Sequence, residues 1–193
     1  MTTDLGRPRD PRIDDSVLRA TVELLGTSGY ADLSVDAIAK RAGTSKPAIC
    51  RRWPSKAHLV HEAVFPISEA TELPDTGSLT GDVREMVRRS TGVLTTPAAR
   101  AAMPGLLAEM ATDPTLHAKL LERFGDVTSR GMTDRLEGAM RRGEVRADIT
   151  AADLVEAIAG MTLMAIITRN QELDDAWVER TAVEGADAVI AVS

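Results

Sequence analysis

Basic residues are concentrated in one short stretch of this 193-residue chain. Lys46, Arg51, Arg52 and Lys56 lie within residues 33–56, which read LSVDAIAKRAGTSKPAICRRWPSK. Lysine and arginine side chains pair with phosphates, and both can also bind base edges in the DNA grooves. A basic cluster alone is more often a solvated face, so the interpretation depends on which secondary structure presents the charges.

Capping residues predict two short helices at a sharp turn within this stretch, followed by the start of a third. Ser34 can cap the first helix, and Gly43 can end it in the left-handed backbone that a helix end commonly needs. Ser45 can cap the second helix, which Pro54 stops, and Ser55 can cap the next. A short basic helix presented by a turn is the geometry that enters the DNA major groove.

Residues 34–56 closely resemble the DNA-binding motif of TetR-family transcriptional regulators. The matching residues are Ala37-Ile38-Ala39, Ala42-Gly43, Ser45-Lys46-Pro47, Ile49, Arg51-Arg52-Trp53 and Pro54-Ser55-Lys56. The resemblance extends over roughly residues 11–65, and beyond that range only the helical layout matches. It implies binding of double-stranded operator DNA, for which the candidate contacts are Ser34, Thr44, Ser45, Lys46, Pro47, Ala48, Cys50, Arg51, Arg52 and Lys56.

Two positions depart from the family pattern. The family most often has tyrosine, whose hydroxyl reaches a phosphate, at the position of Cys50, and often a hydroxyl-bearing residue at the position of Ala48. Cysteine is shorter and a poor hydrogen-bond donor, so one phosphate contact is expected to be lost or replaced. Two alternative interpretations follow. One is a helical small-molecule-binding dimer with weak or lost DNA binding, and the other is oxidation of Cys50 as a redox signal.

The distribution of charge fits a DNA-binding head on a larger body. The formal net charge is −6, with a balance of +3 over residues 1–60 and −9 over residues 61–193. A basic end can meet DNA while the acidic body is repelled by it. A single cysteine excludes an intrachain disulfide and fits the reducing cytoplasm, where we expect the protein to associate with the nucleoid.

Apolar periodicity predicts an all-α protein of about nine helices. The expected helices span residues 11–28, 35–42, 46–53, 55–65, 79–95, 97–112, 114–142, 150–169 and 174–192. The expected domains are a flexible arm at 1–10, a helix-turn-helix domain at 11–65 with its motif at about 34–53, and a ligand-binding and dimerisation domain at 79–193. No membrane association is expected, because the longest apolar region, 154–167, is interrupted by Glu156, Gly160 and Thr162.

Methionines on the predicted body helices suggest an apolar ligand pocket, because methionine adapts to irregular space. Plain core filling is the alternative for any single methionine. The candidate pocket residues are Met86, Met103, Leu107, Met110, Phe124, Met132 and Met164. Because aromatic residues make up 3% of the chain, a flat aromatic ligand would lack stacking partners. We therefore expect a small apolar effector, with His117, Arg100 or Arg123 as candidate polar anchors.

The last two predicted helices suggest a dimer interface. The helix at 150–169 is apolar nearly all round, which is typical of a helix with a partner surface. The resembled family forms a four-helix interface from the last two helices of each subunit, which implies a homodimer on a palindromic operator. The candidate interface residues are Leu154, Ile158, Met161, Ala165, Trp177, Thr181, Gly185 and Ala188.

These patterns favour a ligand-responsive transcriptional repressor, with a TetR-type activator as an alternative. An enzyme is not expected, because the sequence holds no recognisable zinc-ligand set, phosphate loop or nucleophile motif. No catalytic residue, metal or cofactor is expected. His58 and His61 have metal-binding spacing, but without an identifiable third ligand we expect ordinary surface histidines.

Overall fold

The computed structural model describes residues 11–66, 75–146, 148–169 and 173–187, apart from the side chains of residues 11, 120, 121, 123–131 and 169. The helices in these ranges are α1 (Pro11–Asp32), α2 (Val35–Ala42), α3 (Lys46–Cys50), α4 (Lys56–Val64), α6 (Leu79–Leu94), α7 (Pro97–Thr112), α8 (Pro114–Arg141), α9 (Ala151–Arg169) and α10 (Asp175–Asp187). The described residues form no extended β-strand, so the prediction of an all-α fold is confirmed.

Local capping sets most helix ends where the sequence predicts them. The Ser34 hydroxyl accepts a hydrogen bond from an N–H of the first turn of α2 (3.2 Å), and Gly43 ends that helix with a φ of 67°. Ser55 caps α4 in the same way (3.4 Å). Ser45 stands at the start of α3, but its hydroxyl makes no capping hydrogen bond, contrary to the prediction. The Ser45 hydroxyl therefore does not stabilise the first turn of α3.

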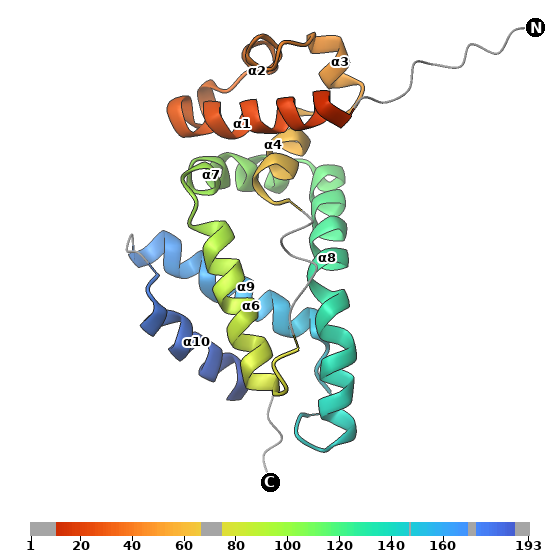
Figure 1. Cartoon of the computed structure of the whole chain (residues 1–193), viewed down its shortest axis with the longest axis vertical. Coiled ribbons are helices and arrows are strands. Elements are labelled where there is room, and N and C mark those ends of the chain that lie inside the picture. The colour runs from red at the N-terminus through yellow and green to blue at the C-terminus, as the bar shows by residue number, and fades with distance from the viewer. Residues whose placement is uncertain (1–10, 67–74, 147, 170–172, 188–193) are drawn as a thin grey trace, which may run out of the picture.

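Helices α1–α4 form a head at one end of the molecule, and α6, α8, α9 and α10 form most of the body (Figure 1). Helix α7 lies between the two, directly against α1. Five residues of α7 and α8 are buried in the same hydrophobic cluster as the core residues of α1–α4: Ala98, Ala99, Ala102, Leu106 and Leu116. The head and the body therefore share a hydrophobic core, and the core of the head is complete only with the residues of α7.

Tyr30 makes a close contact with α7 within this shared core. Its ring covers Gly105 of α7 so closely that a Cβ at this glycine would lie 2.0 Å from the ring atom Cδ1. The Tyr30 hydroxyl donates a hydrogen bond to Oε1 of Glu109, one turn further along α7 (2.7 Å). Burial, and then the Glu109 carboxylate, raise the pKa of the Tyr30 phenol, so it remains a hydrogen-bond donor.

The two faces of α9 differ in their surroundings. Leu154 and Ile158 are each 1% exposed and lie in the body core, where α9 packs against α6 and α8. Met164 and Ile167 on the other side are 58% and 59% exposed. Helix α9 is thus buried along one face, not all round as its composition suggested.

Helix α9 also corrects the argument that its interruptions make this region too polar for a membrane span. Among the described residues, Ala151–Thr168 reaches the length and mean hydropathy (1.6) of a membrane span, although 33% of it is buried inside the protein. The interrupting Glu156, Gly160 and Thr162 do not lower the mean hydropathy of this stretch below that of a membrane span. Packing of its inner face into the body core accounts for the apolar composition on that side.

Gly105→Ala is expected to destabilise the protein, because the added methyl group would overlap the Tyr30 ring. Overpacking of this kind costs about 1–3 kcal/mol, or roughly 2–12 °C in melting temperature for a chain of this size. Differential scanning calorimetry measures the change. Gly92→Ala on α6 is the matched control, because nothing lies within 4 Å of a Cβ there and alanine suits a helix better than glycine. Equal melting temperatures for the two variants would contradict the packing of Tyr30 on Gly105.

Candidate nucleic-acid interface and ligand cleft

The short helix α3 is held firmly on one side. The N–H groups of Arg52 and Trp53 donate to the Ile49 carbonyl (2.8 and 3.0 Å), which continues the helical turn beyond Cys50. Ile49 and Trp53 are 2% and 6% exposed and lie in the shared core. The Trp53 Nε1 donates to Glu62 of α4 (3.1 Å). These anchors fix which side of α3 faces outward.

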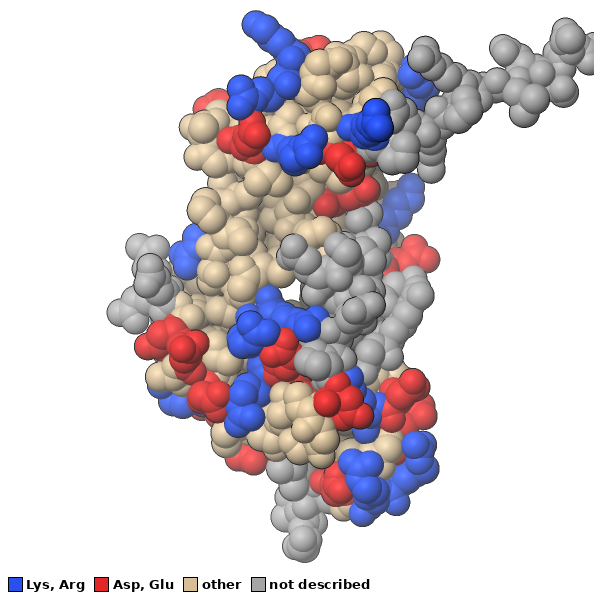
Figure 2. Space-filling model, viewed as in Figure 1, with Lys and Arg blue, Asp and Glu red and all other residues tan. Residues whose placement is uncertain are grey.

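The predicted DNA-contacting residues differ in exposure. Six are exposed on α3 or at the helix ends beside it: Ser34, Ser45, Lys46, Pro47, Cys50 and Arg51. The other four are half-buried: Thr44, Ala48, Arg52 and Lys56. Figure 2 shows lysine and arginine side chains at the outer edge of the head. The exposed group is the surface of the motif that a DNA duplex could reach directly.

Arg52 and Lys56 are held by other parts of the head. Arg52 forms an ion pair with Asp14 of α1, and 17% of the Arg52 side chain is exposed. The Lys56 Nζ donates to the Tyr30 carbonyl (3.1 Å) and lies 4.1 Å from the centre of the Tyr30 ring, a cation–π distance. Both residues therefore help to position the helices of the head. That they also contact phosphate remains a prediction.

Lys46 is exposed and paired with a neighbour on α2. Its Nζ donates to Oδ2 of Asp36 (2.8 Å), and the two side chains are 52% and 69% exposed. The hydrogen bond from Lys46 to Asp36, and then the Asp36 charge, raise the pKa of Lys46. A pair this exposed is screened by water and contributes little to stability. Lys46 can therefore exchange Asp36 for a phosphate or a base edge.

The other reactive side chains of the head show no ligand constellation. Cys50 is exposed. The His58 Nδ1 lies 2.9 Å from the Ser55 hydroxyl oxygen, and the His61 ring lies 5.2 Å from that of Phe65. No group of three metal-ligating side chains occurs among the residues that were placed. The histidine spacing is thus explained by contacts within α4 and with its cap.

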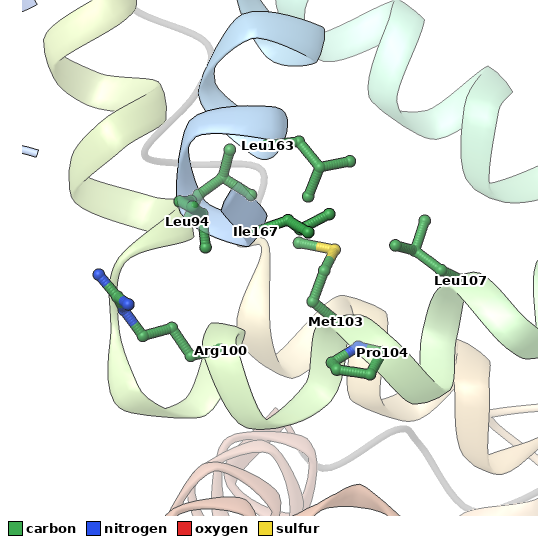
Figure 3. Close-up of a pocket in the computed structure, with 8 residues that line it drawn as sticks. Leu94, Arg100, Met103, Pro104, Leu107, Leu163 and Ile167 are labelled. Atoms are coloured by element: carbon green, nitrogen blue, oxygen red, sulfur yellow. The ribbon is translucent and has the colours of Figure 1, made fainter. Parts of the chain in front are cut away.

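A half-open cleft of about 450 Å³ lies between α6, α7 and α9 (Figure 3). One arginine and seven apolar residues line it: Leu94, Arg100, Met103, Pro104, Leu107, Leu163, Ile166 and Ile167. The lining residues of α7 lie on the side of that helix opposite Ala102 and Leu106, which are buried in the shared core. A single helix therefore separates the cleft from the head.

Two of the seven predicted pocket residues, Met103 and Leu107, line this cleft. Met86 and Met132 are buried in the body core instead, and Met110 packs against the shared core. The type of residue could not separate these cases, because methionine fills a core as readily as a cavity. Of the other two candidates, Met164 is exposed and does not line the cleft, and the side chain of Phe124 lies outside the described residues.

Most of the predicted dimer-interface residues lie in the core of the single subunit. Six are buried there: Leu154, Ile158, Ala165, Trp177, Thr181 and Gly185. Met161 is half-buried against the same core, and Ala188 lies outside the described residues. The pattern identified apolar helix faces but not which face turns inward. The exposed large apolar residues of these two helices are Met164, Ile167 and Val183.

Comparison with known protein families gives a match to each of the two parts of the chain. The family described as "Bacterial regulatory proteins, tetR family" matches residues 17–63, and the family described as "Tetracyclin repressor-like, C-terminal domain" matches residues 73–184. The chain belongs to the TetR family. This confirms the resemblance and makes the protein a DNA-binding transcriptional regulator rather than an enzyme. TetR-family regulators typically act as dimers.

Relatives of this TetR-family chain cover most of its length. An uncharacterized HTH-type transcriptional regulator of Mycobacterium tuberculosis is 31% identical over 173 residues, which cover 86% of this chain and 83% of the relative. The DNA-binding transcriptional repressor TetR of Mycobacteroides abscessus is 30% identical over 170 residues, covering 86% and 87%. The crystal structure of a putative TetR-family regulator from Mesorhizobium loti shares the fold, with a TM-score of 0.67 at 20% identity, covering 94% and 96%.

Asp36→Asn is expected to strengthen binding to a mixed-sequence DNA duplex, because it removes a negative charge beside α3 and releases Lys46. The gain should be about two- to tenfold at low salt and should shrink as salt is raised. Fluorescence anisotropy at two salt concentrations measures it, with Asp134→Asn on α8 as the control of equal charge change. If Asp36→Asn bound no more tightly than Asp134→Asn at low salt, Lys46 would not belong to the DNA-binding surface.

Proposed function

We propose that this TetR-family protein is a homodimeric repressor that binds a palindromic operator and releases it when a small apolar effector occupies the cleft. The observation that carries the proposal is the outer side of α3, where Lys46 and Arg51 are exposed while Ile49 and Trp53 anchor the helix. An anchored helix keeps its position as it enters the groove, and an exposed arginine can bind guanine through two hydrogen bonds.

Exposed apolar side chains on α9 and α10 support dimerisation through these helices. Met164 of α9 is 58% exposed and lies outside the cleft lining, and Val183 of α10 is 46% exposed. Removing such side chains from water favours association. A two-fold dimer would present two copies of α3 about 34 Å apart, one turn of DNA, which is why the proposed operator is palindromic.

Helix α7 supports coupling between the cleft and the head. An effector in the cleft would touch Met103 and Leu107 on one side of α7, while Gly105 and Glu109 on the other side hold Tyr30. Helix α4 also packs against α7, so a shift of α7 reaches α4 as well. The effector changes DNA binding only if it binds the cleft with different affinity in the two states of the dimer.

Repression is proposed over activation because the Mycobacteroides abscessus relative is named a repressor. An activator uses the same contacts with DNA, and the position of the operator relative to the promoter separates the two. A reporter gene placed behind the selected operator would be silenced by a repressor and switched on by an activator.

Arg51→Ala is expected to weaken operator binding about 5- to 100-fold with little change in melting temperature, because Arg51 is exposed and forms no ion pair among the described side chains. Arg52→Ala should lower the melting temperature in addition to weakening operator binding, because Asp14 loses its ion-pair partner. Fluorescence anisotropy on an operator selected from genomic fragments, with calorimetry of the same variants, measures both effects.

Arg141→Ala, at the exposed end of α8, controls for the loss of one positive charge. The proposal requires nanomolar, salt-sensitive binding that prefers the selected operator and survives in this control. If no fragment is selected and the wild type binds weakly and alike on scrambled DNA, the alternative of a ligand-binding dimer without DNA recognition would replace the proposal.

A further inference from the structure

We propose that the cleft takes an aliphatic carboxylate of medium chain length, whose carboxylate pairs with Arg100 while its apolar chain lies along α7 and α9. This inference rests on the proposed function in that it names the chemical class of the effector. It adds that the effector is an anion, where the sequence suggested a small apolar molecule and left three candidate anchors open.

Among the described residues that line the cleft, Arg100 is the only charged one. Of the other two candidate anchors, His117 is exposed on α8 and is not part of the lining, and the side chain of Arg123 lies outside the described residues. Figure 3 shows the Arg100 side chain beside Leu94, at one end of the row of apolar side chains. The cleft is therefore apolar along its length and positively charged at one end.

The Arg100 guanidinium is half-buried and largely unused within the protein. Its Nε donates to the Thr95 carbonyl (3.2 Å), a contact that orients the planar group. Within the described ranges, neither terminal nitrogen has a carboxylate partner. A carboxylate fits two N–H groups of a guanidinium side by side, and such charge-assisted pairs are about twice as strong as neutral hydrogen bonds.

Most other described arginines of the body behave differently. Seven of them pair with acidic side chains of the same chain: Arg84, Arg88, Arg89, Arg135, Arg141, Arg142 and Arg146. The body is acidic, with a balance of −9 over residues 61–193, so internal partners are abundant. Arg100 has no such carboxylate partner among the described residues, which leaves its terminal nitrogens available for an anion from outside.

The walls of the cleft determine which kind of chain can carry the carboxylate. The described apolar residues of these walls are leucine, isoleucine, methionine and proline, and none of them is an aromatic residue that could stack on a flat ring. Unbranched chains adapt to such a surface, and burial of each methylene contributes about 0.8 kcal/mol. The volume of about 450 Å³ lies in the lower part of the range of small-molecule sites. A chain of medium length with one terminal carboxylate matches these limits.

The test measures binding of decanoate, decanol and decylamine to the full-length protein by isothermal titration calorimetry, below the concentrations at which they form micelles. Decanoate should bind about tenfold or more tightly than decanol, and decylamine most weakly. Arg100→Met should reduce decanoate affinity to that of decanol without changing decanol binding, and Arg100→Lys should restore part of the preference. Arg141→Met is the matched control and should bind all three compounds as the wild type does.

Three results would overturn the inference: equal affinity for decanoate and decanol, unchanged decanoate binding in Arg100→Met, or no binding of any of the three compounds. Operator binding of the same wild-type protein without ligand is measured in parallel. Intact, salt-dependent operator binding together with any of these three results would leave the proposed regulator standing and remove only the anionic effector. A decanoate preference in a protein that does not bind DNA would support the anionic ligand and remove the proposed regulator.

Discussion

The contact between the Tyr30 ring and Gly105 is the constraint on which the relation of head to body depends. It lets α1 approach the backbone of α7, and it places the Tyr30 hydroxyl on Glu109. The alanines of α7 then fill the space beneath the head, where larger side chains would hold the two parts apart. Because the cleft lies on the other side of α7, the same helix is part of the head's core and part of the wall of the proposed ligand site.

In the proposed mode of DNA recognition, the basic residues of the motif have two different roles. Arg52 and Lys56 are held by Asp14 and Tyr30, so they set the geometry of α3 and α4. Lys46 and Arg51 stay at the surface, where their charge can meet DNA. An acidic body behind a basic head discourages the protein from lying along the duplex. In this proposal, DNA binds at the surface whose shape is set by the buried side of α3.

Features set by neighbouring residues could be predicted from the sequence, and features set by distant contacts could not. Ser34, Gly43 and Ser55 mark helix ends because a cap acts within one turn. Met86 and Met103 carry the same side chain on neighbouring helices, yet one fills the core and the other lines the cleft. The face of α9 that turns inward depends on α6 and α8, and the position of Lys56 depends on Tyr30, 26 residues away.

The central claim, that α7 couples the head to the cleft, is tested most directly by amide hydrogen exchange of the full-length protein with and without its selected operator. Coupling is reciprocal, so DNA bound at α3 should increase protection in residues 97–112 of α7 as well as in residues 11–66. A rise in protection confined to residues 11–66, with α7 exchanging at the same rate in both states, would contradict the claim.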